Sequence, residues 1–196
     1  MNRSIAIVSL AACRLAGAAQ ADLLTVDWQT AGDGLLTLDT STGLYWLDWT
    51  VATNLSRDTM EVELQAGGSF GGMGFRYASV AELHALCGAA GAPDVDGRTA
   101  ANVPAVTGML SQMGANNFYN FLGAGNSSAA HVGASGIFGI LTIETFDNPV
   151  TAKAGQLGGT VTHVPGLGHA LVTTVPTPGA AAVLGLAGLG AMRRRR

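Results

Sequence analysis

The side chains of this chain that could bind a metal ion are few and scattered. His163 and His169 flank the Pro165-Gly166 pair, and on a hairpin there, with an acidic partner, their imidazoles could hold a metal ion. The other two histidines, His84 and His131, lie far from them in the sequence. Because histidines in an exposed loop need no such role, the sequence does not favour a metal site.

Cys87 lies three residues after His84, a spacing at which an imidazole could activate a thiolate. The same segment carries Val80, Leu83 and Leu86 at helical spacing, so Cys87 falls on an apolar face. We therefore expect Cys87 to be a small buried hydrophobic residue and not a nucleophile. The second cysteine, Cys13, lies in the N-terminal segment, and no internal disulfide is expected.

Two further segments contain residue types that bind ligands in other proteins. Asp94-Val95-Asp96-Gly97 begins like a calcium loop but lacks the further ligands and the distal Glu, which leaves a solvated turn as the alternative. In the segment from Leu44 to Trp49, aromatic faces could stack on sugar rings. Strand alternation places Tyr45, Leu47 and Trp49 on one face, expected to be core, and leaves a surface binding role open for Trp46.

Sequence motifs of catalysis are missing from the chain. It has no His-Glu-x-x-His helix, phosphate-binding Gly-x-x-x-x-Gly-Lys loop or Cys-x-x-Cys pair. We therefore expect a protein that is not an enzyme, with no catalytic, cofactor-binding or metal-binding residue.

The N-terminal segment reads as an export signal. Arg3 supplies a positive charge, an apolar stretch follows, and Ala19-Gln20-Ala21 forms a small-x-small cleavage site before Asp22. We expect signal peptidase to remove residues 1–21. An alternative is a lipobox at Leu10-Ala11-Ala12-Cys13, in which Cys13 would carry a lipid.

The C-terminal segment has three parts: a Pro-x-Pro element, an apolar run and a basic end. Val175, Pro176 and Pro178 begin it, Gly179 to Met192 carries no charge, and four arginines close it, namely Arg193, Arg194, Arg195 and Arg196. As a helix of about 1.5 Å per residue, the apolar run would reach roughly 21 Å, short of a bilayer core of about 30 Å. Arginines favour the cytoplasmic side. These features favour a removable address over a permanent anchor.

The three-part tail at residues 175–196 resembles the PEP-CTERM sorting signal of Gram-negative bacteria. That resemblance implies recognition by an exosortase-type membrane protease after transient retention in the inner membrane. The sequence departs from the usual Pro-Glu-Pro, since Thr177 stands between the two prolines, as in a VPTPGA variant. An ordinary tail anchor with a basic flank is the alternative.

Between the two terminal segments, residues 22–174 form one domain of acidic composition. All thirteen acidic residues of the chain lie there, against four basic ones: Arg57, Arg76, Arg98 and Lys153. Such a domain has no basic surface for nucleic acid or for anionic lipid.

Hydrophobic patterns and turn residues within residues 22–174 predict an α+β fold with an antiparallel sheet and two or three short helices. A cleavable signal helix before this domain and a short hydrophobic helix after it complete the prediction. We expect strands at 23–28, 35–38, 44–49, 137–146 and 168–175, with a weaker one at 160–164. We expect helices at 56–65, at 79–88 from a Ser79/Glu82 capping box, and at 104–113; residues 124–136 read as a mobile loop.

Two motifs of the domain, Gly32 to Asp48 and Gly74 to Leu83, resemble the start of the mature part of many PEP-CTERM proteins. They are more loosely similar to C-type-lectin-like C-terminal domains of bacterial collagen-like adhesins, which implies a final apolar strand near Ala170-Leu171-Val172. The sequence therefore predicts an exported cell-surface or extracellular-matrix protein with a structural or adhesive role, with exopolysaccharide as a possible partner. A secreted carbohydrate-binding protein or an enzyme with an unrecognised site is the alternative.

Overall fold

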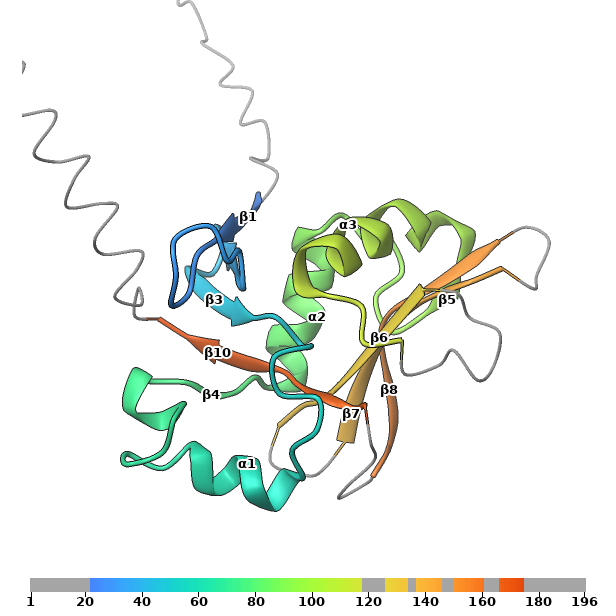
Figure 1. Cartoon of the computed structure of the whole chain (residues 1–196). Coiled ribbons are helices and arrows are strands. Elements are labelled where there is room, and N and C mark those ends of the chain that lie inside the picture. Colours follow the sequence, from blue (N-terminus) through green and yellow to red (C-terminus); the bar gives the residue numbers. More distant parts are fainter. Residues whose placement is uncertain (1–21, 118–125, 134–136, 146–149, 161–165, 175–196) are drawn as a thin grey trace, which may run out of the picture.

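The described part of the chain contains two five-stranded sheets and three α-helices, so the fold is α+β (Figure 1). The computed structural model describes residues 22–117, 126–133, 137–145, 150–160 and 166–174. The predicted signal helix and the predicted C-terminal helix lie outside these ranges. Sheet A has the strand order β1-β2-β3-β10-β4, and sheet B has the order β5-β8-β7-β6-β9. The single antiparallel sheet that the sequence predicted is thus two sheets.

Sheet A begins with a three-stranded meander whose strands are β1 (Leu23–Val26), β2 (Leu36–Asp39) and β3 (Leu44–Leu47). Asp33 closes the first connection, since its carboxylate accepts hydrogen bonds from the backbone N–H groups of Trp28, Gln29, Thr30 and Leu35. Gly43, at a φ of 71°, completes the tight second connection that the sequence predicted. The last strand, β10 (Leu171–Thr173), then inserts between β3 and β4 (Arg76–Tyr77).

Sheet B consists of β5 (Arg98–Thr99), β8 (Thr151–Thr160), β7 (Ile137–Glu144), β6 (Asn126–His131) and β9 (Gly168–His169). The β6–β9 pair is parallel, whereas the other pairs of described strands in both sheets are antiparallel. The chain passes from sheet B to sheet A through Ala170, the single residue between β9 and β10.

The predicted helices are present, with boundaries shifted by one or two residues. They are α1 (Arg57–Glu63), capped by Ser56, α2 (Val80–Ala89), opened by the Ser79/Glu82 capping box, and α3 (Val103–Met113). Helix α2 runs through Gly88, at which it was expected to end, and two 3₁₀ turns, η1 (Gly71–Met73) and η2 (Ala100–Asn102), precede β4 and α3.

One prediction for the second half of the domain is wrong, because the expected loop at residues 124–136 contains strand β6. Strand β8, which ends at Thr160, was not expected either, and the rest of the strand expected at 160–164 lies outside the described residues. Both strands are rich in Gly, Ala, Ser and Thr, so intrinsic β propensity does not reveal them. Their burial between neighbouring strands and helices α2 and α3 determines the conformation instead.

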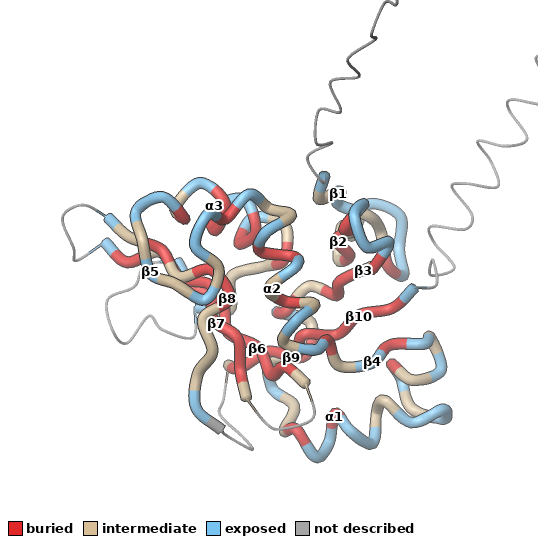
Figure 2. Tube along the Cα trace, turned by 180° about the vertical axis from the view of Figure 1, so that it is seen from behind, coloured by how far each residue is buried: buried red, intermediate tan, exposed pale blue. Residues whose placement is uncertain are grey.

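The main core lies between sheet A, sheet B and helices α2 and α3. Figure 2 shows buried residues, in red, along the strands of both sheets. Trp46, Trp49, Leu83, Met109 and Leu141 are among its fully buried members. A second apolar cluster covers the other face of sheet A, with Leu36, Leu47, Met60, Phe70 and Leu171 among its residues. The central strands of sheet A, namely β2, β3 and β10, are therefore covered on both faces.

Candidate functional site

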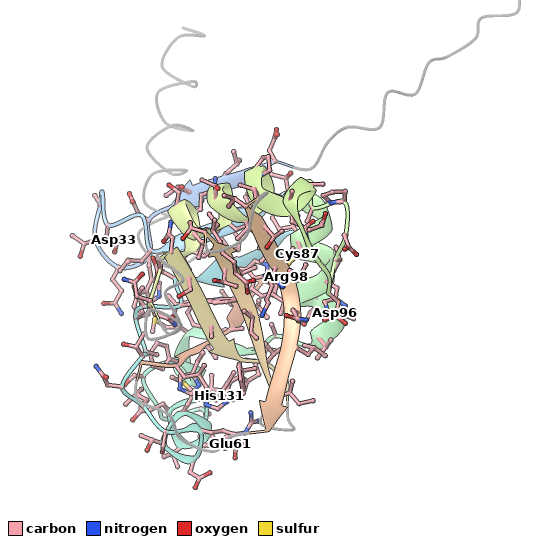
Figure 3. The ribbon with its side chains drawn as sticks, turned by 90° about the vertical axis from the view of Figure 1, so that its right-hand side faces the viewer. Asp33, Glu61, Cys87, Asp96, Arg98 and His131 are labelled. Atoms are coloured by element: carbon pink, nitrogen blue, oxygen red, sulfur yellow. The ribbon has the colours of Figure 1, made fainter. Side chains whose placement is uncertain are left out.

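A group of buried and partly buried polar side chains lies where the chain crosses from sheet B to sheet A. Tyr77 comes from β4, His131 from β6, His169 from β9 and Arg57 from the first turn of α1. His131 and His169 are each 1% exposed, and Arg57 is 6% exposed. Residues from both sheets and from a helix thus meet in one place, in the lower half of the molecule, where Figure 3 labels His131 and Glu61.

Hydrogen bonds fix the tautomer of His169. Its Nε2 lies 3.1 Å from the carbonyl oxygen of Leu55, which can only accept, so Nε2 carries the proton. The other ring nitrogen, Nδ1, lies 2.7 Å from the hydroxyl of Tyr77 and accepts its hydrogen bond. Both ring nitrogens of His169 are therefore occupied.

The ring of His131 and the guanidinium group of Arg57 pack closely around the Tyr77–His169 pair. The rings of His131 and His169 have centroids 5.0 Å apart, and the guanidinium carbon of Arg57 lies 4.7 Å from the centroid of the Tyr77 ring. Nη2 of Arg57 donates to the carbonyl oxygen of Gly133 over 2.8 Å, and Nε donates to Glu61 over 2.9 Å. Helix α1 is thereby attached to the end of β6.

Burial favours the neutral forms of His169 and Tyr77. It lowers the pKa of His169, and the nearby Arg57 charge acts in the same direction. Burial also raises the pKa of Tyr77 well above its usual value. A neutral imidazole with both nitrogens bonded and no exposure offers neither a lone pair to a metal nor a base to a substrate, so the cluster joins structural elements.

The metal site considered for His163 and His169 is not supported on the His169 side. His169 is buried and not in an exposed loop, and its two nitrogens already have partners. His163 lies outside the described residues. Among the residues that the structure describes, no group of three or more His, Cys, Asp or Glu side chains could hold a metal ion.

Cys87 is fully buried, as predicted, and burial raises the pKa of its thiol to about 12. A thiol of this kind is protonated at neutral pH and is therefore no nucleophile. Cys87 is one of the buried residues of helix α2, and Figure 3 labels it.

The Asp94–Gly97 turn serves the fold. The amide of the fully buried Asn102 donates to the carbonyl oxygen of Asp94 over 2.8 Å, and a carboxylate oxygen of Asp96 accepts from the backbone N–H of Leu157 over 3.1 Å. The turn thus fastens η2 to β8.

Trp46 is 1% exposed, so the surface binding role left open for it is wrong. The prediction assumed that one face of this strand meets water, whereas both faces of the central strands of sheet A are covered. The expected core position of Trp49 is confirmed, but Trp49 packs in the same cluster as Trp46. Strand β3 ends at Leu47, so the alternation does not extend to residue 49.

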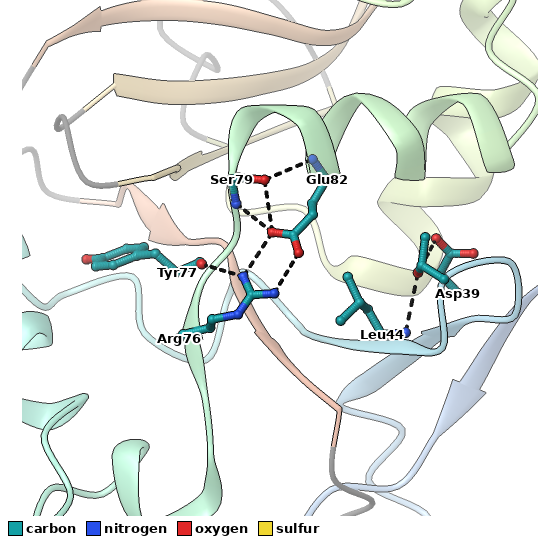
Figure 4. A network of polar contacts seen from close by, with 7 residues as sticks. Asp39, Leu44, Arg76, Tyr77, Ser79 and Glu82 are labelled. Atoms are coloured by element: carbon teal, nitrogen blue, oxygen red, sulfur yellow. Dashed lines mark hydrogen bonds and ion pairs between the residues drawn. The ribbon is translucent and has the colours of Figure 1, made fainter.

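Arg76 of β4 pairs with Glu82 of helix α2. The two side chains form two hydrogen bonds, of 2.9 and 2.6 Å, and the same carboxylate accepts from the backbone N–H of Ser79 (Figure 4). Hydrogen bonding by Arg76 holds the pKa of Glu82 at about 2.

On sheet B, Glu144 is buried and forms two ion pairs. One is with Arg98, and the other, over 3.1 Å, is with Lys153.

Sequence reasoning missed the cluster of Arg57, Tyr77, His131 and His169 because its members are separated by tens of residues and follow no motif. Only the strand pairing reveals it.

A cavity of about 190 Å³ lies elsewhere, between β1, the end of α2 and α3. It is lined mostly by small apolar residues, together with Asp22 and Gln112. Gln112 donates to the carbonyl oxygen of Leu23 over 3.0 Å, so α3 also holds the edge strand β1.

Of the residues predicted for signal cleavage and sorting, the structure describes only Asp22. Its backbone N–H donates to Oγ1 of Thr40 over 2.9 Å, which attaches the predicted mature end to the β2–β3 turn. Ala19 and Ala21, and the sorting residues Val175, Pro176, Pro178 and Arg193 to Arg196, lie outside the described ranges. None of the described helices has both the length and the apolar character needed to cross a membrane.

No protein-family model, curated protein or solved structure matches the chain.

Proposed function

We propose that this protein is exported and sorted through its C-terminal tail to the cell surface or extracellular matrix, where it has a structural or adhesive role. One observation carries the proposal: the folded elements lie just inside the two terminal motifs. Strand β1 begins at Leu23, two residues after Ala21, and β10 ends at Thr173, two residues before Val175. Both motifs can therefore be removed without loss of a described core residue.

The proposed route uses both ends of the chain. Signal peptidase removes residues 1–21, and the tail at 175–196 holds the chain in the inner membrane through a short hydrophobic helix. An exosortase-type protease then cuts near the Pro-x-Pro element and releases the acidic domain to the cell surface or extracellular matrix. There we expect exopolysaccharide to be its partner. The domain needs no cofactor in this role.

A non-enzymatic role is supported by the way the described titratable side chains are used. The four basic residues of the domain, Arg57, Arg76, Arg98 and Lys153, each form an ion pair with a carboxylate. Asp33, Asp39 and Asp48 accept hydrogen bonds within their own turns. These charged groups stabilise the fold of the domain. A stable domain is what a protein that works outside the cell requires.

Mass spectrometry of the protein from its native host tests the proposal. We expect an N-terminus at Asp22 and a C-terminus near Val175. Replacement of Arg193 to Arg196 by Ser should abolish membrane retention, whereas Pro176→Ala with Pro178→Ala should preserve retention and block processing. An intact Met1, a lipid on Cys13, or normal processing of the proline variant would contradict it.

A further inference from the structure

Both ends of the domain leave sheet A at the same end of that sheet. Asp22 pairs with Thr40 through the bond from the Thr40 N–H to the Asp22 carbonyl, one step beyond the Leu23–Asp39 pair. Asp39 is opposite Leu44, and β10 runs antiparallel to β3 with Thr173 opposite Tyr45. The chain therefore enters β1 and leaves β10 beside the same β2–β3 turn.

The separation of these two points follows from the strand order. Three strand-to-strand steps lead from β1 to β10, and neighbouring strands lie about 4.8 Å apart, so Asp22 and Thr174 are about 15 Å apart across the sheet. Figure 1 shows β1 and the free end of β10 on the same side of the molecule. The segments attached to the two ends can reach one membrane together, as the proposed route requires.

Strand β10 cannot supply extra length to a processing enzyme. It lies between β3 and β4, and Leu171 and Val172 are fully buried. The hydroxyl of Thr173 also reaches the carbonyl oxygen of Met73 in η1, at 3.5 Å. A cut within this strand would remove core residues, so the folded domain permits cleavage only beyond Thr173.

The short connection forces any enzyme at the tail against the domain. From Thr173 to Pro176 the chain takes three steps, which span at most about 10 Å when fully extended. A protease that holds Pro176 and Pro178 is much larger than this gap. It must therefore touch the surface around the end of β10.

That surface consists of small, uncharged residues, which we call the exit rim: Thr40–Gly43, Gly72–Gly74 and Thr174. All of these residues except Met73 are exposed. The turn on one side is fixed, because the buried Asp39 carboxylate accepts from the hydroxyls of Ser41 and Thr42 over 2.6 and 2.8 Å. Such a rim lets another protein approach closely without bulky or charged side chains in between.

Resting on the proposed function, we propose that the exit rim is the docking surface for the membrane protease that processes the tail. The enzyme reads the Pro-x-Pro element and, at the same time, lies against the rim. The two-residue spacing from β10 to Pro176 is then part of the recognition.

The test is the variant Gly72→Trp in the full chain, expressed in the native host and followed by the rate of tail removal. A Cβ at Gly72 meets only the Ala66 carbonyl oxygen, at 3.6 Å, so the backbone tolerates the larger side chain while the rim becomes bulky. We expect processing to slow about tenfold, the equivalent of about 1.4 kcal/mol of lost docking. The matched control is Gly159→Trp on β8, where a Cβ meets nothing within 4 Å; it should be processed normally.

A second variant separates docking from misfolding. A flexible Gly-Ser spacer of about eight residues between Thr174 and Val175 should slow processing of the otherwise wild-type chain to about the same extent, because the tail then reaches the enzyme without the rim. Gly72→Trp should have no further effect in the chain that carries the spacer. Normal processing of Gly72→Trp, or a further loss when it is combined with the spacer, overturns the docking surface. If the wild-type tail is not processed at all, the proposed function fails instead. If anionic lipid or dimerisation of the domain restored the processing rate of Gly72→Trp, that result would also overturn the docking surface.

Discussion

The hydroxyl of Tyr77 on β4 lies 2.7 Å from Nδ1 of His169 on β9, and this hydrogen bond joins sheet A to sheet B. The backbone reinforces the connection at the same place, since the N–H of Ala78 donates to the carbonyl oxygen of Ala170 over 2.8 Å. Because His169 also donates to Leu55, the segment that leads into α1 is held by the same imidazole. Loss of this one ring should loosen three elements together.

Tyr77→Phe should destabilise the domain by about 1–3 kcal/mol, because it leaves the buried Nδ1 of His169 without a donor. The phenyl ring stays under Arg57, so packing changes little. Urea unfolding followed by tryptophan fluorescence measures the effect, and Tyr45→Phe on β3 of the same sheet is a matched control. Equal stabilities of the two variants would argue against the Tyr77–His169 bond.

Stability should fall as the pH drops below about 6.5, the ordinary pKa of histidine. The folded state lowers the pKa of His169, so below that pH the unfolded chain binds a proton that the folded chain does not. The contribution is complete above the unfolded pKa and declines as the solution becomes more acidic. Thermal melts at about pH 7.5 and about pH 5.5 should differ more for wild type than for His169→Gln. If His169→Gln showed the same difference in melting temperature between the two pH values as wild type, His169 would not be the origin of the pH dependence.

The Arg76–Glu82–Ser79 network predicts a second, more acidic transition. Ser79→Ala should cost about 1 kcal/mol by removing the N-cap of α2. The pKa of Glu82 is held at about 2, against 4.5 in the unfolded chain, so its stabilisation is complete above pH 4.5 and is lost as the pH falls toward 2. Acid titrations of wild type and Glu82→Gln, followed by circular dichroism, should differ in this window. The half-exposed Arg76 predicts a smaller effect in high salt.

Local signals explain which elements could be predicted from the sequence. Ser56 and the Ser79/Glu82 capping box mark helix starts, and the spacing of Val106, Met109, Leu110 and Met113 gives the buried face of α3. These signals act over a few residues, so they are visible in one sequence.

The features that could not be predicted depend on distant partners. Strand β6, with the sequence Asn-Ser-Ser-Ala-Ala-His, has the composition of a loop, and only its pairing with β7 and β9 makes it a strand. Trp46 is buried because β10, from the other end of the domain, pairs beside it. The His131–His169 contact arises in the same way, through the parallel β6–β9 pair.

Asn102 is a further position that sequence reasoning did not identify. Its fully buried amide donates to Asp94 and Gly97, and its Oδ1 accepts from the N–H of Asp94 over 3.2 Å. Asn102→Ala should cost about 2–4 kcal/mol through several unsatisfied backbone groups. Asn102→Asp should be at least as unfavourable at neutral pH, because a carboxylate oxygen then faces carbonyl oxygens. Hydrogen exchange should increase first at Asp94, and a stable Asn102→Asp protein would contradict this role.

Gly155 and Cys87 test the packing of β8 on α2. Gly155 has a φ of +73°, and a Cβ there would lie 2.9 Å from Sγ of Cys87. Gly155→Ala should therefore destabilise the domain by more than about 1 kcal/mol, from backbone strain and from the clash. Cys87→Ala added to it should relieve the clash but not the strain, so the double variant should lose less stability than the sum of the single ones. Gly159→Ala, with an open position and no positive φ, should remain within about 0.5 kcal/mol of wild type. Urea unfolding of the four variants gives the coupling, and strict additivity would show that the clash is relieved by movement of β8 instead.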